Sequence, residues 1–444
     1  MSSPRLARYA ALAAVLALWP HAGHAQSLPY GDVSDGDSAS SADSAAPRGS
    51  GRAPRVKVTP YIEAQQVVFA ELRPGDEVVT YSIIAAGVDA AIRGRNNEGS
   101  VSVRYERRFG WGNNAQDSDA ISGVARFSSA VIPNTLSIEA GALAARNSIE
   151  NNGAALNNGL NFGDSVTQIY SVYAGPSLRT NVDDVQVSGS YRLGYSRVES
   201  PNAIPVAAGQ PAIDLFDESV VHSAAIRAGT RPGDYLPVGV GVGAGYNRED
   251  ISNLDQRVED LHVRGDVTLP VGNDLSLVGG VGWEKVEVSS RDAVRDPVTG
   301  DPVVGSDGRF VTDKSAPRIL SYQAEGLIWD AGVVWRPSRR TALEAHVGRR
   351  YGSTTYYGSF AYAPSARTSL NVSVYDTISG FGGQLNTALA NLPTQFQAQR
   401  NPFSGNVGGC VQAEGTVAAG QGTCLNGALG GVRSAVFRSR GVAG

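Results

Sequence analysis

The sequence lacks the long apolar segments from which membrane-spanning helices are built. Beyond the first 25 residues, no stretch of about 18 uninterrupted apolar residues occurs. Helical membrane spans are therefore excluded. A chain of this kind can enter a bilayer only as a closed β-barrel, because every backbone N–H and C=O group in hydrocarbon must find a partner within the protein.

Cysteine and methionine are nearly absent. The chain has one methionine and two cysteines, Cys410 and Cys424, which lie close together near its end. Two cysteines alone do not make a zinc site, so we expect no metal. In an exported protein an isolated pair is most simply a local disulfide. Such a bond would close a short loop and add about 3 kcal/mol of stability by restricting the unfolded chain.

Charged residues are also few, at 18%, and the net charge is -4 at pH 7. This mild acidity argues against a nucleic-acid partner, which requires basic patches. Glycine is abundant instead, with 53 residues. The glycine-rich residues 239–243 alternate with valine and do not follow the strand, loop and helix template of a phosphate-binding site. We therefore expect no cofactor.

The N-terminus has the order of a secretory signal peptide. Arg5 and Arg8 precede an apolar stretch at residues 10–19, and small residues lead to Ala25. We expect residues 1–25 to be removed, which takes away two arginines and no acids and lowers the net charge from -4 to -6. Residues 26–55 are rich in Ser, Asp, Ala, Gly and Pro, and are predicted to form a disordered periplasmic leader.

From residue 56 onward, apolar and polar residues alternate with a period of two. Residues 185–198 are a clear case, with an apolar face made of Val185, Val187, Tyr191, Leu193 and Tyr195. The opposite face is polar and contains Gln186, Ser188, Ser190, Arg192 and Ser196. Because successive side chains of a strand point to opposite faces, this pattern predicts strands with one apolar and one polar face.

The connections between these segments alternate in length. Short turns rich in Pro, Gly, Asn and Asp occur at residues 132–135, 181–184, 231–234, 272–274, 336–339 and 364–366. Longer polar loops occur at 148–165, 200–217, 251–257 and 291–317. Short turns on one side and long loops on the other are typical of outer-membrane barrels. An N-terminus in the periplasm makes all the short turns periplasmic.

The sequence therefore predicts an all-β fold, a transmembrane antiparallel β-barrel of about sixteen strands over residues 56–444 in the outer membrane. We expect the strands at 56–72, 77–93, 99–110, 119–131, 135–147, 165–180, 185–199, 218–230, 236–250, 257–271, 274–290, 318–336, 340–351, 355–363, 367–377 and 432–443.

Residues 378–431 interrupt this pattern. Phe381, Leu385, Leu389 and Leu392 have helical spacing, and the part beyond residue 402 is rich in glycine and holds both cysteines. We expect a helix over residues 380–398 that is held against the barrel, with a disulfide loop after it as a lid or contact surface. The segment is either a large extracellular loop or a plug folded into the lumen, where the glycine face of 239–245 would leave room for it.

Charged residues recur on the polar faces of several strands, and we expect them to line the lumen. They are Arg104, Glu106, Arg108, Arg192, Asp260, His262, Arg264, Asp266, Glu344, His346 and Arg350. The mixed signs favour a structural network that fills the lumen over an ion-selecting constriction, which tends to show one sign. The pair Asp260 and His262 could in principle serve a hydrolase. We assign no catalytic residue.

Residues 339–351, continuing through 354–357 into 367–370, resemble late hairpins of outer-membrane β-barrel proteins associated with exosortase (PEP-CTERM) and exopolysaccharide systems. The opening residues 59–63 resemble them too. Some similar alphaproteobacterial proteins are named preprotein translocase subunit YajC, although nothing here resembles that short single-helix protein. The resemblance implies an export- or exopolysaccharide-associated envelope component. We expect no enzymatic activity, because neighbouring charges inside a barrel pair with one another.

Two other functions remain open, a general porin for small solutes and an outer-membrane hydrolase. The expected partners are outer-membrane lipid, lipopolysaccharide, the barrel-insertion machinery and polysaccharide or protein export partners. The chain ends on residues 440–444, without the terminal aromatic residue usual in this class. We therefore expect either an atypical closing strand or a truncated chain. In the second case the longer protein would have more than sixteen strands.

Overall fold

The computed structural model describes residues 55–70, 78–111, 117–149, 155–156, 166–199, 204–205, 212–213, 218–306, 308–365, 368–400, 407–413, 422–425, 429 and 436–443. The predicted signal peptide lies outside these residues. The predicted leader also lies outside them, apart from Arg55, which begins the first strand. Both stay predictions.

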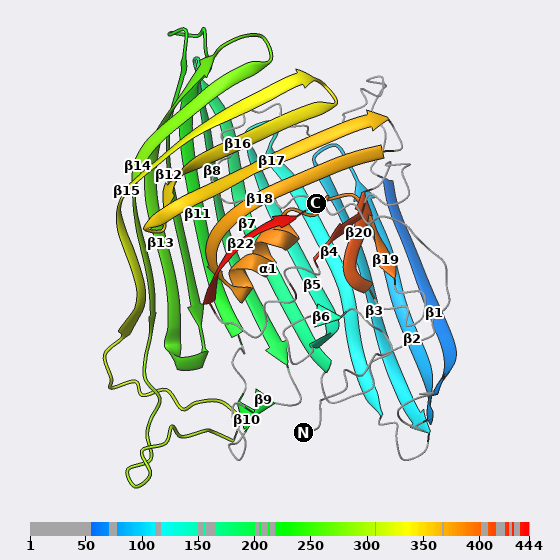
Figure 1. Ribbon diagram of the computed structural model, residues 1–444. Helices are drawn as coiled ribbons and strands as arrows, with labels where there is room; N and C mark the ends of the chain where they lie inside the picture. Colours follow the sequence, from blue (N-terminus) through cyan, green and yellow to red (C-terminus); the bar gives the residue numbers. More distant parts are fainter. Residues whose placement is uncertain are drawn as a thin grey trace, which may run out of the picture.

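One large antiparallel sheet dominates the molecule (Figure 1). Its sixteen long strands are β1 (Arg55–Ala70), β2 (Val78–Arg93), β3 (Asn97–Trp111), β4 (Ser118–Ile132), β5 (Leu136–Ile149), β7 (Val166–Val182), β8 (Val185–Glu199), β11 (Glu218–Thr230), β12 (Gly239–Ile251), β13 (Gln256–Pro270), β14 (Leu275–Ser290), β15 (Ile319–Ser338), β16 (Thr341–Arg350), β17 (Ser353–Ser365), β18 (Thr368–Gly380) and β22 (Val436–Ala443). The two-residue β6 (Ala155–Leu156) is a seventeenth member. β9 (Ile204–Pro205) pairs separately with β10 (Ala212–Ile213).

The predicted sixteen-stranded antiparallel sheet is confirmed, and the strands pair as a meander in chain order. Most predicted boundaries differ from the observed ones by a few residues. One loop was predicted wrongly: the connection between β12 and β13 is only a short turn that contains the 3-10 helix η1 (Asn253–Asp255).

Residues suited to left-handed backbone make several of the tight reversals. Asn134 and Asp183 have φ values of 60° and 53°, in the turns between β4 and β5 and between β7 and β8. Short polar side chains tolerate this conformation because they can bond locally to the backbone. These turns lie at one end of the sheet, called here the short-turn end. The 28-residue connection at 291–318 lies at the opposite, long-loop end.

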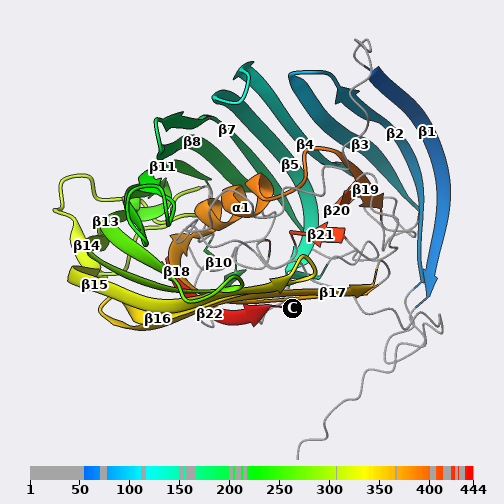
Figure 2. The same cartoon turned by 90° about the horizontal axis from the view of Figure 1, so that it is seen from above.

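The sheet curves strongly, and Figure 2 shows that its concave side encloses the helix α1. Within the described residues, β1 pairs with β2 alone and β22 pairs with β18 alone. No described pairing joins β1 to β22, so the closure expected of a barrel is not found among the residues that the structure describes.

The two faces of the sheet differ as the alternation predicts. In β3, Ser102, Arg104 and Glu106 point to the concave side and are at most 3% exposed. Their neighbours Val103 and Tyr105 point outward and are 37% and 45% exposed. The other strands continue this outward apolar surface, which includes Ile121, Leu193, Val263, Trp283, Leu327, Trp329 and Tyr356. An apolar outer band with aromatic residues is the surface that a bilayer covers.

The segment after β18 folds back into the concave side. It forms helix α1 (Phe381–Ala390) and a small sheet of β19 (Phe396–Arg400), β20 (Val407–Ala413) and β21 (Gly422–Cys424). The helix predicted over residues 380–398 is therefore too long at its C-terminal end. The observed helix ends at Ala390, and β19 begins at Phe396. No helix in the described part of the chain is long and apolar enough to cross a membrane.

The register of β20 and β21 places Cys410 opposite Cys424, and Cys410 is disulfide-bonded. β20 contacts β3, β4 and β5, so this small sheet lies against the first part of the inner wall. The insert therefore covers two neighbouring regions of the concave side, α1 on β5 to β11 and β20 on β3 to β5.

Candidate functional site: the charged inner wall and the docked insert

A cluster of charged side chains on the inner wall centres on Asp330 of β15. This carboxylate accepts hydrogen bonds from Nε and Nη2 of Arg264 at 2.7 and 2.8 Å. It lies 3.2 Å from Nδ1 of His346 and accepts a bond from the hydroxyl of Tyr357 at 3.1 Å. The His346 and Tyr357 rings are stacked with centroids 4.5 Å apart. Because Asp330 is buried, these groups take the place of water around its charge.

The cluster extends in both directions along the wall. Asp266 accepts hydrogen bonds from Arg264 at 3.1 Å and from Arg227 of β11 at 2.7 Å. On the other side, Nε2 of His346 lies 3.2 Å from Glu344. Charges of opposite sign on neighbouring strands therefore neutralise each other across β11, β13, β15 and β16.

A second cluster lies nearer the long-loop end and centres on Arg350. Its guanidinium donates to Asp260 at 2.9 Å and to Glu284 at 3.1 Å. His262 lies 3.1 Å from Asp260 through Nδ1. The Asp260 carboxylate is thus shared between an arginine and a histidine. This arrangement neutralises buried charge and differs from an Asp–His pair devoted to activating a nucleophile.

A third cluster ties the insert to the first strands. Arg104 pairs with Glu63 of β1 and lies 3.5 Å from Glu106, which accepts a bond from Arg108 at 2.7 Å. Arg400 of β19 reaches the same group, 3.6 Å from Glu63. The small sheet of the insert is therefore held to the wall by charge as well as by packing.

An apolar stripe of α1 seats the helix on the wall. Phe381, Leu385 and Leu389 are fully buried and share a core with Tyr173 and other residues of β4, β5, β7, β8 and β12. Two glycines make room for the helix, and a Cβ atom on Gly194 would lie 2.5 Å from the amide carbon of Asn386. Asn386 itself donates to Ser196 at 3.1 Å. The other glycine is Gly141, beneath Tyr173 and Leu389.

The glycine face of β12, expected to receive this helix, serves neighbouring side chains instead. Gly241 lies beneath the guanidinium of Arg227, and Gly245 lies beneath the ring of His262. The contribution of β12 to the helix is Glu249, which is fully buried and accepts the N–H of Gly383 at 3.1 Å. A carboxylate is favourable at this place because the first N–H groups of a helix carry partial positive charge.

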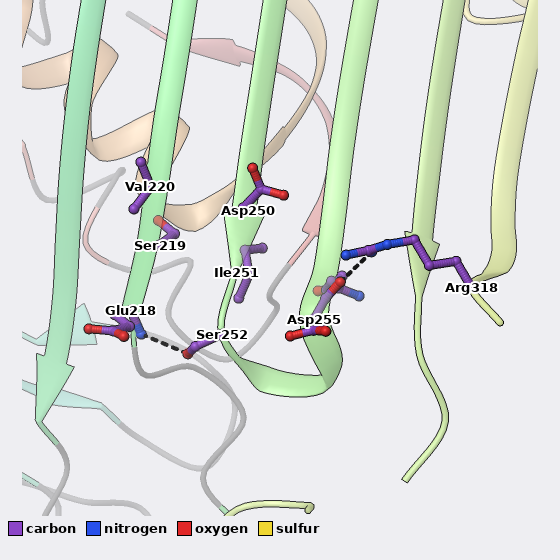
Figure 3. Close-up of a pocket in the computed structure, with 9 residues that line it drawn as sticks. Glu218, Ser219, Val220, Asp250, Ile251, Ser252, Asp255 and Arg318 are labelled. Carbon is purple, nitrogen blue, oxygen red and sulfur yellow. Dashed lines mark hydrogen bonds between the residues drawn. The ribbon is translucent and has the colours of Figure 1, made fainter. Parts of the chain in front are cut away.

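A cleft of about 190 Å³ lies at the long-loop ends of β11, β12 and β13 (Figure 3). It is lined by Glu218, Ser219, Val220, Asp250, Ile251, Ser252, Asp255, Gln256 and Arg318. Its charges already have partners: Arg318 donates to the backbone oxygen of Asp255, and Asp250 accepts from Arg248 at 2.6 Å and Arg257 at 2.7 Å. In the described residues no group of three or more His, Cys, Asp or Glu side chains could hold a metal ion.

The connection between β14 and β15 carries its own hydrogen-bonded turns at the long-loop end. Asp313 accepts bonds from the hydroxyl of Ser315 at 2.6 Å and from its backbone N–H at 2.9 Å. These bonds, the hydroxyl first, hold the pKa of Asp313 below its ordinary value because they favour the ionised carboxylate.

The residues predicted to line the lumen fall into separate groups on the inner wall. The clusters around Asp330 and Arg350 include Asp260, His262, Arg264, Asp266, Glu344, His346 and Arg350. Arg104, Glu106 and Arg108 belong to the third cluster. Arg192 stands apart, beneath α1 beside Tyr173. Four inner-wall residues were not predicted. Asp330 is the centre of the first cluster, and Arg126, Tyr173 and Glu249 contact the insert. The alternation of their strands already placed all four on inward positions.

No protein-family model matches the sequence, and no curated protein matches it. Among solved structures, the chain is similar to the ferric-catecholate import receptor Fiu of Escherichia coli in its open form. The two are 9% identical, the match covers 72% of this chain and 59% of that one, and the TM-score is 0.37. It is also similar to the FrpB iron transporter of Neisseria meningitidis, at 10% identity, 81% and 58% coverage and a TM-score of 0.40.

A third similar structure is OmpT, an outer membrane protein of Vibrio cholerae, at 11% identity, 70% and 89% coverage and a TM-score of 0.29. The chain spans about three fifths of the length of the two iron-transport proteins. At these values the likeness carries no inference about substrate. The apolar outward band, the charged inner wall and the antiparallel order of the strands are together those of an outer-membrane protein, as predicted.

Proposed function

We propose that this protein is an outer-membrane conduit that its own insert keeps closed, and that it serves the export of a surface polysaccharide or another envelope component. The observation that carries the proposal is the burial of Phe381, Leu385 and Leu389 against the concave wall. An insert that shares a core with five strands blocks that part of the lumen. The proposal includes closure of the β1 and β22 edges, because an open sheet edge is not tolerated in lipid.

A general porin is the second candidate, favoured by the balanced charges of the inner wall. Arg264 pairs with Asp330, and Arg350 pairs with Glu284, so these two clusters of the inner wall carry both signs of charge. An ion-selecting constriction tends to show one sign. The two candidates differ in the state of the resting protein. A porin conducts steadily, whereas a conduit with a docked insert stays closed until the insert moves.

Substitution of Gly194 by valine tests the proposed function without altering the insert. The new side chain would occupy the space of the Asn386 amide, because a Cβ atom there would already lie 2.5 Å from it. Overpacking of this kind costs about 1 to 3 kcal/mol, which shifts the docked helix toward undocked states by roughly fivefold to a hundredfold. We expect planar-bilayer recordings to show a closed wild type and frequent openings of G194V.

Gly189 of the same strand provides the matched control. It faces outward, and a Cβ atom there would meet only the oxygen of Ala225 at 3.7 Å. G189V should therefore behave like the wild type. A steady open conductance in the wild type would favour the porin, and equal currents in wild type and G194V would contradict a gate formed by α1.

We further propose that the protein is not an enzyme. His262 is the histidine nearest to a hydrolase-like arrangement, yet its partner Asp260 is also bonded to Arg350. Replacing His262 by alanine should leave the gating of the conduit unchanged. The purified wild-type protein and the purified H262A variant should cleave peptide, ester and glycoside substrates at the same low rate. A hydrolysis rate that falls at least a hundredfold in H262A would establish a catalytic role instead.

A further inference from the structure

Three polar side chains of the inner wall converge beneath the C-terminal end of α1. They are Arg126 of β4, Tyr173 of β7 and Arg192 of β8. The guanidinium carbons of Arg126 and Arg192 lie 5.5 and 5.3 Å from the centroid of the Tyr173 ring. The ring rests on Gly141 of β5, which has no side chain to displace it. Residues from four strands thus build one small polar site on the wall.

This site contains hydrogen-bond donors that the described residues do not use. Nη1 of Arg126 and the hydroxyl of Tyr173 are buried without a hydrogen-bond partner, and the two residues are only 6% and 2% exposed. Buried donors are nearly always paired in proteins, because an unmade bond costs the full desolvation of the group. Within the described residues Arg192 contacts the ring and makes no hydrogen bond. It is partly exposed, so it is open to the lumen.

The charge of the site favours an anion. Glu139 lies 3.7 Å from Nη2 of Arg126, and among the described residues it is the one carboxylate within ion-pair distance of either guanidinium group. Guanidinium groups bind oxyanions through paired N–H donors, which fit the two oxygens of a carboxylate. Nε of Arg126 donates to the carbonyl of Leu392 at 3.1 Å, which leaves Nη1 for a ligand.

We infer that Arg126, Arg192 and Tyr173 form an oxyanion subsite that takes a carboxylate of an acidic saccharide chain. The inference rests on the proposed conduit function, which supplies a saccharide as the class of ligand. The buried donors supply the affinity for an anion, and the partly exposed Arg192 supplies access from the lumen. The subsite lies where α1 ends, so a chain bound there is already in contact with the gate.

Calorimetric titration of the full-length protein in detergent tests the inference. The probes are a short oligogalacturonate, a maltooligosaccharide of the same length and inorganic phosphate. We expect the oligogalacturonate to bind and the neutral maltooligosaccharide not to bind. Arg192→Gln should weaken oligogalacturonate binding roughly tenfold or more, and Tyr173→Phe, which removes only the hydroxyl, should weaken it several-fold. Arg227→Gln is the control, because Arg227 lies on β11 and is paired with Asp266.

Equal affinities of the wild type, R192Q and Y173F for the oligogalacturonate would overturn the subsite. Binding of phosphate without oligogalacturonate binding would also overturn the assignment to a saccharide. The recordings of G194V are independent of these titrations. If the channel is gated but does not bind the oligogalacturonate, the subsite is contradicted and the conduit stands. If the channel is steadily open but binds the oligogalacturonate, the gate is contradicted and the subsite stands.

Discussion

Replacing Asp330 by alanine is expected to lower the free energy of unfolding by about 3 to 5 kcal/mol. The carboxylate is 5% exposed and is bonded to Arg264, His346 and Tyr357 together. Its removal takes two hydrogen bonds from the buried guanidinium of Arg264, which keeps its bond to Asp266. Urea unfolding of the protein in lipid vesicles, followed by tryptophan fluorescence, measures the loss.

The surface pair Arg197 and Glu199 provides the comparison. Its atoms lie 3.2 Å apart, but both side chains are about half exposed. An exposed pair contributes at most about 1 kcal/mol, so Glu199→Gln should change the unfolding free energy little. If D330A were as stable as E199Q, the inner-wall cluster would not be the stabilising network described above.

Replacing Leu389 by aspartate is expected to release the helix α1 from the wall. Leu389 is fully buried on Tyr173 and Gly141. An aspartate there would place a carboxylate in an apolar seat, at a cost of at least about 3 kcal/mol, which corresponds to roughly a hundredfold shift toward the undocked insert. Cells that express L389D should become sensitive to large antibiotics that an intact outer membrane excludes.

Gln384 is the matched control on the same helix. It is only partly buried, and Gln384→Asp adds the same charge outside the apolar stripe. Q384D should leave antibiotic resistance at the wild-type level, with both variants present in the outer membrane at equal amounts. Resistance that is unchanged in L389D would mean that α1 does not close the conduit.

Much of the sheet was predictable because its information is local. Whether a side chain faces inward follows from its parity within a strand, so the inward placement of Arg104, His262 and His346 needed only the alternation. The tight turns at Asn134 and Asp183 were predictable for the same reason, since a short polar residue marks a reversal of the chain.

The partners of these inward charges could not be predicted, because they depend on how segments far apart in the sequence come together in space. Arg350 meets Asp260 across 90 positions, and Arg126 meets Leu392 across 266. Asp330 looks like any other inward acid in the sequence. It becomes a hub only where β15 lies between β14 and β16.

The sequence by itself determined that this chain forms amphipathic strands for an outer membrane, because a period of two repeated along the chain permits little else. It also indicated a helix near Phe381. Only the tertiary structure decided where that helix lies. Its apolar stripe fits any apolar surface. The helix lies on β5, β7, β8 and β11 because Gly141 and Gly194 leave space for it there. Glu249 also accepts a hydrogen bond from the first turn of the helix at this place.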